Sequence, residues 1–169
     1  MSLSVQESKH IAKKIGRDLS ITERQIIAAE WSEHCSYKSS KKHLKILPTT
    51  GRNVINEKGY DSGVLDVGDG YVVTVHIESH NHPSAVEPYG GAATGVGGVI
   101  RDILSTGTRP IAIFDGLRFG DIENDTHARW LFKNAVSGIA DYGNCLGIPT
   151  IGGEVEFDEC YKNYALVDV

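Results

Sequence analysis

One segment constrains the fold more than any other, because an alternating strand pattern runs directly into a cluster of polar side chains. Every second side chain over residues 71–78 is apolar and is predicted to face the core: Tyr71, Val73, Val75 and Ile77. The opposite face is polar and carries Thr74, His76 and Glu78. The polar run continues through Ser79, His80, Asn81 and His82, and Pro83 is predicted to end the strand. Polar groups therefore collect at the mouth of a strand, where α/β proteins often bind ligands.

The rest of the chain alternates between helix and strand patterns, which indicates an α/β or α+β fold. Helices are expected over residues 2–15, from a capping box at Ser20 and Glu23 to about 33–35, over 96–104 before Gly107, and from a cap at Asp125 to Gly143. Strands are expected at 71–78, 110–115, 150–157 and 164–169, in a sheet with helices on one face. Residues 38–45 and 51–70 are expected to be loops and turns, with Asp69-Gly70 opening a hairpin.

The composition fits one globular domain and excludes several classes of protein. Of the 169 residues, 40% are hydrophobic and 23% are charged, and the formal net charge is −5. A nucleic-acid-binding cationic face is therefore not expected, and no apolar run reaches the roughly 18 residues of a membrane span. The three cysteines have no CxxC spacing, which favours a reducing cytoplasm. Because residues 164–169 form a strand pattern without a polar tail, we expect a fragment of a longer protein.

The polar run at residues 76–82 has several chemical interpretations. Three histidines near a glutamate could bind zinc, with His80 and His82 as an i,i+2 pair, or could be solvated residues at a strand end. The glycine-rich stretch that follows could lead into a helix N-terminus that binds a phosphate, or could serve close packing of helix and strand. Zinc is the less attractive interpretation, because no cysteine lies nearby.

Arg101 and Asp102 follow on the predicted helix. A surface ion pair is the simplest interpretation of this dipeptide. Alternatively, Arg101 could contact a phosphate, and Asp102 could join Glu78 as an oxygen ligand of Mg²⁺. Magnesium is usually held by one or two carboxylates and by substrate phosphates, which matches this set of residues.

His34 and Cys35 are neighbours near the end of the second predicted helix, next to Tyr37 and Lys38. Neighbouring residues on a helix point about 100° apart, which disfavours a Cys–His dyad. We therefore expect His34 to act as a general acid or base, or as an orienting group.

Three segments together resemble a known family: EHCSYKSS (33–40), HIESHNHPSAVEPYGGAATGVGGVIRDIL (76–104) and IPTIGGEVEFDE (148–159). These segments occur in the same order as in the large subunit of phosphoribosylformylglycinamidine synthases, to which the chain is similar over roughly residues 18–169. The resemblance implies an α+β fold of the aminoimidazole-ribonucleotide-synthetase-like kind, a mixed sheet with helices on one face. It implies one N-terminal domain over residues 1–169, with a short helical segment at about 1–35. Since the family's large subunit is several times longer, it also implies a fragment of a multi-domain chain.

The same resemblance implies an ATP- and Mg²⁺-dependent ligase of purine biosynthesis. Formylglycinamide ribonucleotide, glutamine and ATP give formylglycinamidine ribonucleotide, glutamate, ADP and phosphate. ATP phosphorylates the amide oxygen, and ammonia then displaces the phosphate. The implied partners are a glutaminase subunit and a small accessory subunit, in the cytoplasm. The isolated chain is expected to be inactive and to form a homodimer through its sheet or to expose an apolar patch.

Individual roles also follow from the resemblance. His34 matches an active-site histidine, and His80 is the expected proton acceptor. The implied substrate contacts are Ser79, His80, Asn81, His82 and Arg101. Glu78 and Asp102 match magnesium ligands, and Tyr37 matches an ATP contact.

His76, also assigned to ATP, stands where many members have a lysine. A lysine stays charged at neutral pH, whereas a histidine, whose unperturbed pKa is about 6.5, need not.

Three other interpretations stay open. A selenophosphate-synthetase-like or thiamine-phosphate-kinase-like enzyme would share the fold and Mg-ATP, but those families are not known for EHCSYK or SHNHPS. A non-catalytic nucleotide-binding module would keep the fold without turnover. A zinc hydrolase would hold stoichiometric zinc.

Overall fold

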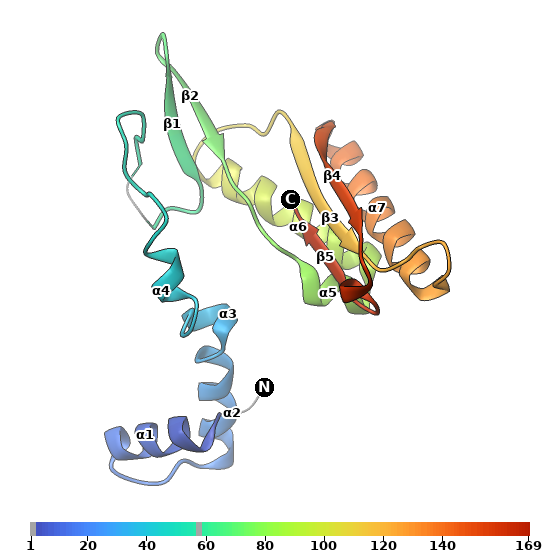
Figure 1. The fold of residues 1–169 in the computed structure, drawn as a ribbon. Coiled ribbons are helices and arrows are strands. Elements are labelled where there is room, and N and C mark those ends of the chain that lie inside the picture. Colours follow the sequence, from blue (N-terminus) through green and yellow to red (C-terminus); the bar gives the residue numbers. More distant parts are fainter. Residues whose placement is uncertain (1–2, 57–58) are drawn as a thin grey trace. The chain divides into compact units, whose positions relative to one another are not determined.

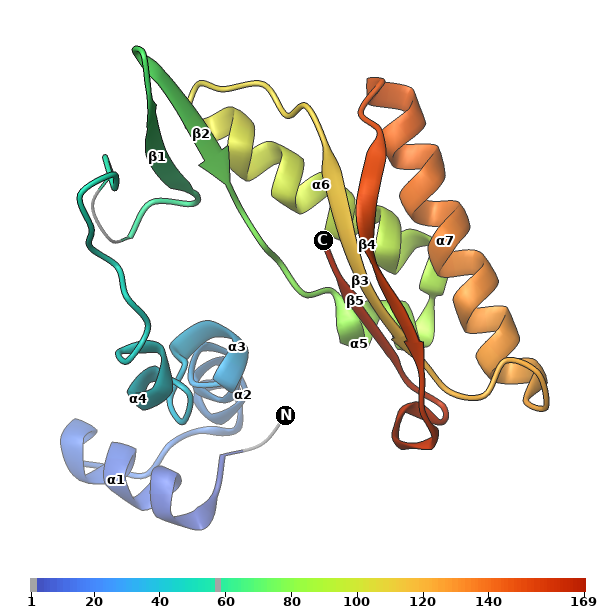
Figure 2. The same ribbon diagram turned by 45° about the horizontal axis from the view of Figure 1, so that its top comes forward.

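The chain divides into two compact units, Met1–Thr49 and Thr50–Val169, in a computed structural model that describes residues 3–56 and 59–169. Figure 1 and Figure 2 show the elements of each unit. Ser2, in a predicted helix, and residues 57–58, in a predicted turn region, lie outside the described residues.

The described residues of the first unit form four helices: α1 (Val5–Ile15), α2 (Ile21–Glu30), α3 (Glu33–Ser36) and α4 (Lys41–Leu44). The predicted capping box of Ser20 and Glu23 begins α2. The prediction that this helix continues to residues 33–35 is wrong, because Ser32 accepts a hydrogen bond from the Cys35 N–H and starts α3. Residues 38–45, expected to be a loop, contain α4.

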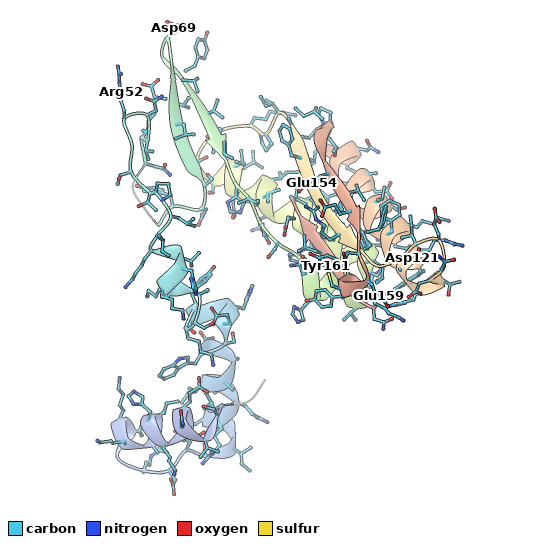
Figure 3. The ribbon with its side chains drawn as sticks, in the orientation of Figure 1. Arg52, Asp69, Asp121, Glu154, Glu159 and Tyr161 are labelled. Atoms are coloured by element: carbon cyan, nitrogen blue, oxygen red, sulfur yellow. The ribbon has the colours of Figure 1, made fainter. Side chains whose placement is uncertain are left out.

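A β-hairpin near the start of the second unit consists of β1 (Gly63–Gly68) and β2 (Tyr71–Val75). Asp69 and Gly70 connect the strands with φ values of 52° and 78°, which a tight hairpin turn requires. Asp69 lies at the tip of the hairpin (Figure 3). The predicted turn is therefore confirmed, but β1 was missed, because its glycines and aspartate resemble turn residues.

The apolar face of β2 does not belong to the core, contrary to the expectation from sequence. Tyr71 is 72% exposed and Ile77 is 77% exposed, and Val73 and Val75 are also exposed. The hairpin is a two-stranded sheet among the described residues, so no further strand shields this face there. The alternation itself is present, because Thr74, His76 and Glu78 are half-buried.

The main sheet is mixed, with the strand order β4 (Thr150–Phe157), β3 (Ile113–Phe119) and β5 (Ala165–Asp168). β3 runs parallel to β4 and antiparallel to β5. β3 begins at Ile113, not at residue 110 as expected.

The chain after the hairpin continues along the free edge of β5. Glu78 and Val169 exchange two backbone hydrogen bonds of 3.0 Å, and the His80 N–H donates to the Val167 carbonyl at 2.8 Å. Residues 78–80 therefore join the main sheet, whereas β2 pairs with β1 instead. The expectation that the whole strand 71–78 belongs to the main sheet is wrong.

Two long helices, α6 (Pro88–Ser105) and α7 (Thr126–Leu146), lie on one side of the main sheet (Figure 2). The short α5 (Asn81–Val86) precedes them, and a 3-10 turn, η1 (Glu159–Tyr161), connects β4 to β5. Asp125 caps α7 as predicted, but the helix continues past Gly143 and stops at Gly147, whose φ is 67°. Across the described part of the chain, no helix combines the length and apolar character that crossing a bilayer requires.

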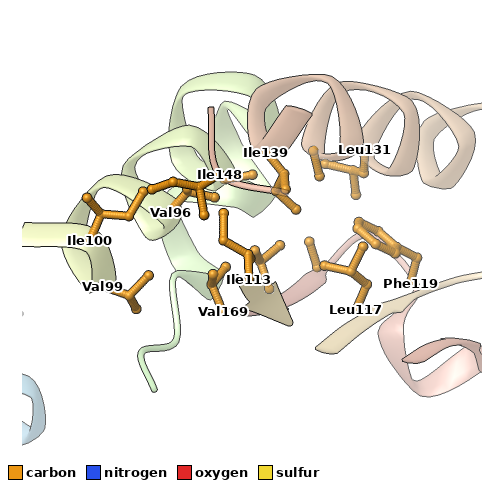
Figure 4. Packing of buried hydrophobic residues seen from close by; sticks show 14 residues of the cluster. Val96, Val99, Ile100, Ile113, Leu117, Phe119, Leu131, Ile139, Ile148 and Val169 are labelled. Carbon is orange, nitrogen blue, oxygen red and sulfur yellow. The ribbon is translucent and has the colours of Figure 1, made fainter. Parts of the chain in front are cut away.

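The core lies between the main sheet and these helices (Figure 4). Its buried side chains come from α6, α7, β3 and β5, and include Val96, Ile100, Leu131, Ile139, Leu117, Phe119 and Val167. The predicted α+β architecture, a mixed sheet with helices on one face, is confirmed.

The glycine-rich stretch 90–98 is entirely helical, so the helix starts earlier than residue 96, where the sequence predicts its beginning. α6 begins at Pro88, and the Glu87 carboxylate accepts a hydrogen bond from the Gly90 N–H. A phosphate at this helix N-terminus would be repelled by that carboxylate, so the geometry disfavours the phosphate interpretation. A Cβ at position 97 would lie 2.8 Å from the Tyr142 ring, so this glycine serves close packing of α6 against α7.

Candidate metal and substrate site

Three polar side chains from two separate segments converge in the second unit. His76 and Glu78 lie on the extended segment between β2 and α5, and Asp102 lies near the C-terminal end of α6. The Nε2 of His76 is 3.2 Å from Asp102 Oδ2 and 3.9 Å from Glu78 Oε2. One possible ligand atom of each residue lies within 4.8 Å of the others. These three residues are termed the carboxylate–imidazole cluster.

The close approach of α6 to Glu78 depends on a glycine. A Cβ at Gly98 would lie 2.9 Å from Glu78 Cδ, and closer still to a carboxylate oxygen. Gly98 and Asp102 are four residues apart and therefore share one face of the helix. That face makes room for Glu78 and presents Asp102 to it, in line with the close packing of helix and strand that the sequence offers for the glycine-rich stretch.

Glu78 also contacts His80 through its other oxygen. Glu78 Oε1 lies 3.3 Å from His80 Nδ1. When Nδ1 donates its hydrogen to this carboxylate, Nε2 carries the free lone pair and can accept a proton. The geometry is thus compatible with the proton-acceptor role expected for His80.

Ser79 and Asn81 lie beside β5, where the backbone is held in place. Ser79 is exposed and pairs with Asp168 as an isolated bridge. Asn81 Oδ1 accepts a hydrogen bond of 2.7 Å from the Val167 N–H. The Asn81 carbonyl therefore has a structural role, and its NH₂ group is the part that can contact a ligand.

His82 is directed toward Tyr164 and does not belong to the carboxylate–imidazole cluster. Its Nδ1 lies 2.9 Å from the Tyr164 hydroxyl, and the two rings meet edge to face with centroids 5.5 Å apart. The pairing of His80 with His82 as zinc ligands is therefore not the observed arrangement. Tyr164 was missed from sequence, because it is distant along the chain and belongs to no motif.

Arg101 is exposed on α6, next to Asp102 in sequence. Its guanidinium makes no hydrogen bond or ion pair with any other described residue. Asp102 faces His76, so the simple surface pair of Arg101 with Asp102 is absent there. The expected contact of Arg101 with substrate stays a prediction.

The remaining expected site residues belong to the first unit. His34, Cys35 and Tyr37 are exposed on α3 and at its end, where Tyr37 adopts a φ of 50°. Glu33 shapes this turn, since its carboxylate accepts hydrogen bonds from the backbone and hydroxyl groups of Ser39 and Ser40. These bonds lower the pKa of Glu33 to about 2. The roles expected for His34 and Tyr37 stay predictions.

The donor set of the carboxylate–imidazole cluster fits a divalent cation. Two carboxylates and one imidazole supply hard oxygen and borderline nitrogen ligands, with ligand atoms close enough to share one ion. The absence of cysteine sulfur and of a second imidazole from this group argues against a structural zinc centre.

Two family models match separate parts of the chain, and each match lies within one of the two compact units. The model for the AIR synthase related protein, N-terminal domain, matches residues 59–169. A second family model, the formylglycinamide ribonucleotide amidotransferase linker domain, matches residues 1–38.

Curated relatives are similar to almost the whole chain. Phosphoribosylformylglycinamidine synthase subunit PurL of Caldanaerobacter subterraneus subsp. tengcongensis is 55% identical over 168 residues, which are 99% of this chain and 23% of that protein. The subunit of the same name from Pyrococcus horikoshii is 54% identical over 164 residues, which are 97% of this chain and 23% of that protein. The chain thus spans about a quarter of the length of these relatives.

Solved structures support the same fold. Thermotoga maritima PurL complexed with FGAR has a TM-score of 0.79 and 44% identity, covering 98% of this chain and 25% of that one. The same protein complexed with ADP has a TM-score of 0.79 and 42% identity, covering 98% and 26%. Aquifex aeolicus ThiL complexed with AMPPCP and TMP, at 13% identity and a TM-score of 0.52 over 83% of this chain and 41% of that one, shares the fold alone.

Proposed function

This chain belongs to the family of the AIR synthase related protein N-terminal domain, and we propose that it forms the N-terminal part of an ATP-dependent carbon–nitrogen ligase of purine biosynthesis. In the proposed reaction, formylglycinamide ribonucleotide, ammonia from glutamine and ATP give formylglycinamidine ribonucleotide, ADP and phosphate. The proposal is supported by relatives of that name at 55% identity over 99% of the chain. It is also supported by the fold shared with T. maritima PurL complexed with FGAR and with ADP.

The observation that carries this proposal is the convergence of Glu78, on the extended segment after β2, with Asp102 of α6. His80 contacts the same Glu78 carboxylate. Glu78 and Asp102 would hold Mg²⁺, which when bound offsets negative charge on phosphate oxygens. Their ligand atoms lie close enough to serve one ion together with His76. His80, with Nδ1 against the Glu78 carboxylate, would accept a proton at Nε2 during ammonia attack.

The substrate contacts come from the run that begins at residue 79. Ser79, the Asn81 NH₂ group and His82 would bind polar groups of formylglycinamide ribonucleotide, and Tyr164 would position His82. Arg101, exposed on α6, would donate hydrogen bonds from its guanidinium to a phosphate group of the substrate. We assign His34 to the chemical step and Tyr37 to ATP, on the resemblance of EHCSYKSS to the family.

The proposed assembly is a multi-subunit synthase in the cytoplasm. We propose that residues 1–169 form one N-terminal domain with a helical segment at about 1–35, within a longer chain. A glutaminase subunit and a small accessory subunit would complete the enzyme, in line with the structure named PurLQS from T. maritima, at 43% identity over 98% of this chain. The segment alone would be inactive.

The helix-free face of the main sheet supports pairing of two such domains. Arg118 lies on that face in ion pairs with Glu154 and Glu156, the latter at 3.0 Å. The exposed apolar side chains of β2 lie in the same unit. A homodimer of the segment through its sheet is therefore part of the proposal.

The test is an assay of the full-length protein with ATP, Mg²⁺, ammonium chloride and formylglycinamide ribonucleotide. Ammonium chloride bypasses the glutaminase partner, so the synthase alone is measured. The proposal predicts one ADP per formylglycinamidine ribonucleotide formed, and no ADP when the ribonucleotide is omitted. ADP formation that needs thiamine phosphate in its place, or nucleotide binding without any turnover, would contradict it.

A further inference from the structure

We propose that His76 is a direct metal ligand, so that the carboxylate–imidazole cluster selects a divalent cation that accepts a nitrogen ligand, such as Mn²⁺, over Mg²⁺. This metal site is the one in the proposed function. The inference rests on that function only for the role of the metal in phosphoryl transfer. Its test measures metal binding alone, so its failure is distinguishable from failure of the proposed reaction.

The distances between the donor atoms are compatible with one shared ion. Two ligands bonded to one ion at about 2.1 Å lie about 3.0 Å apart at a right angle and about 4.2 Å apart on opposite sides. His76 Nε2 and Asp102 Oδ2 are 3.2 Å apart, close to the right-angle value. His76 Nε2 and Glu78 Oε2 are 3.9 Å apart, which lies between the two values. Glu78 and Asp102 offer ligand atoms within 4.8 Å of each other, so a single ion can bond all three residues after small side-chain movements.

The surroundings of His76 support ligation rather than a nucleotide contact. The His76 side chain is 18% exposed, whereas Glu78 and Asp102 are 30% and 35% exposed. The imidazole is thus the least exposed of the three groups, and its Nε2 faces both carboxylates. When an ion occupies that space, the lone pair of Nε2 points at it and the hydrogen resides on Nδ1.

The contacts of Glu78 set the number of protein ligands. Its Oε1 is directed to His80 Nδ1, which leaves Oε2 for the cluster. Glu78 therefore supplies one oxygen, Asp102 a second and His76 a nitrogen. Three positions of an octahedral ion remain for water and for phosphate oxygens.

The chemistry of nitrogen ligation decides which ion is preferred. Mg²⁺ demands an oxygen-rich octahedral shell and dehydrates reluctantly. Imidazole suits later divalent metals, and Mn²⁺ accepts both carboxylate and imidazole ligands while keeping octahedral geometry. An imidazole in place of a third oxygen or a water thus shifts the selectivity of the site away from Mg²⁺.

The test uses the metal-free, full-length protein, titrated with Mn²⁺ and separately with Mg²⁺ without nucleotide. Electron spin echo spectroscopy of bound Mn²⁺ reports directly whether a nitrogen is coordinated. We expect a nitrogen coupling in the unsubstituted protein, and Mn²⁺ binding at least about tenfold tighter than Mg²⁺ binding. His76→Gln should abolish the coupling and weaken Mn²⁺ binding about tenfold, while Mg²⁺ binding changes less than about twofold.

Two histidine variants serve as controls. His127→Gln changes an exposed histidine that stacks on Trp130 of α7, and should leave the coupling and both affinities unchanged. His80→Gln should retain the coupling, because His80 contacts Glu78 from outside the cluster.

Several results would overturn the inference. These are bound Mn²⁺ without nitrogen coupling, loss of the coupling in His80→Gln but not in His76→Gln, equal affinities for both ions, or no Mn²⁺ binding. The spectrum of the unsubstituted protein shows whether a nitrogen is bonded to Mn²⁺, even when a variant fails to fold. An inactive ligase with nitrogen-coupled Mn²⁺ would contradict the proposed function and leave this inference intact.

Discussion

Gly98 of α6 lies against the carboxylate of Glu78, so closely that a Cβ at position 98 would be 2.9 Å from Glu78 Cδ. Alanine is favoured over glycine in a helix interior by about 1 kcal/mol, so the glycine is retained at a cost to the helix. The contact therefore links the packing of α6 to the placement of a proposed metal ligand.

Gly98→Ala should separate the stability of the helix from the function of the site. The added methyl group displaces the Glu78 carboxylate, so affinity for a divalent cation should fall at least about tenfold, as with other substitutions that disturb ligand orientation. Calorimetric titration measures the affinity, and thermal unfolding reports the fold. Thr94→Ala, an exposed position one turn earlier in α6, is the matched control and should bind metal normally. Unchanged metal affinity in Gly98→Ala would show that Glu78 is not a ligand.

The carboxylates of the cluster should control magnesium dependence. Glu78→Gln and Asp102→Asn keep the side-chain shape and remove the charge. In the full-length enzyme each should lower turnover about a hundredfold or more and raise the magnesium concentration needed for half-maximal rate, with the fold intact. Steady-state rates over a magnesium series provide the measurement. Near-normal turnover and magnesium dependence in either variant would leave substrate contacts as the role of this site.

His34→Ala should have a different kinetic signature. We assign His34 to the chemical step and not to the metal, so turnover should fall while the magnesium dependence stays as in the unsubstituted enzyme. Cys35→Ala, at the neighbouring exposed position on α3, should retain turnover, because we assign no chemistry to the thiol. A shift in the magnesium dependence of His34→Ala would instead connect His34 with the metal.

The turn after α3 should be sensitive to acid through Glu33. Hydrogen bonds from Ser39 and Ser40 lower its pKa to about 2, against an ordinary value of 4.5. A carboxylate with a lowered folded-state pKa stabilises the fold fully above its ordinary value, and this stabilisation is lost as pH falls from about 4.5 toward 2.

Carbon-detected NMR of the Glu33 carboxyl group measures this directly. Ser39→Ala together with Ser40→Ala should raise the pKa of Glu33 toward its ordinary value. Ser36→Ala should not, because the Ser36 hydroxyl donates to the Ser32 carbonyl instead. An ordinary titration of Glu33 in the unsubstituted protein would refute the hydrogen-bonded turn.

Local signals in the sequence predicted the elements whose causes are themselves local. The box of Ser20 and Glu23 and the cap Asp125 act within one helical turn, and both begin helices as expected. The strand patterns at 150–157 and 164–169 likewise match β4 and β5. Errors arose where tertiary contacts decide. The glycines of α6 have low helix propensity, and the contact that requires one of them, Gly97 against Tyr142, is a tertiary contact that no local pattern encodes.

The candidate site was predictable only in part, because local patterns identify its residues but tertiary contacts bring them together. Glu78 and Asp102 were expected as a pair, and their convergence with His76 follows from pairing of residues 78–80 with β5 and from the approach of α6. The contact of His82 with Tyr164 joins residues 82 positions apart, and no local pattern encodes it. The exposure of Tyr71 and Ile77 was missed because alternation specifies two faces but not which of them is covered.

The most direct test of the site is a crystal structure of the full-length protein soaked with Mn²⁺ and a non-hydrolysable ATP analogue, with data collected at the manganese absorption edge. In the proposed site, Glu78 and Asp102 hold the cation that contacts the nucleotide phosphates. We predict an anomalous peak within about 2.4 Å of Glu78 Oε2 and Asp102 Oδ2, with a phosphate oxygen in the same coordination shell. A nucleotide bound with its manganese away from both carboxylates, or a peak only at His80 and His82, would contradict this account.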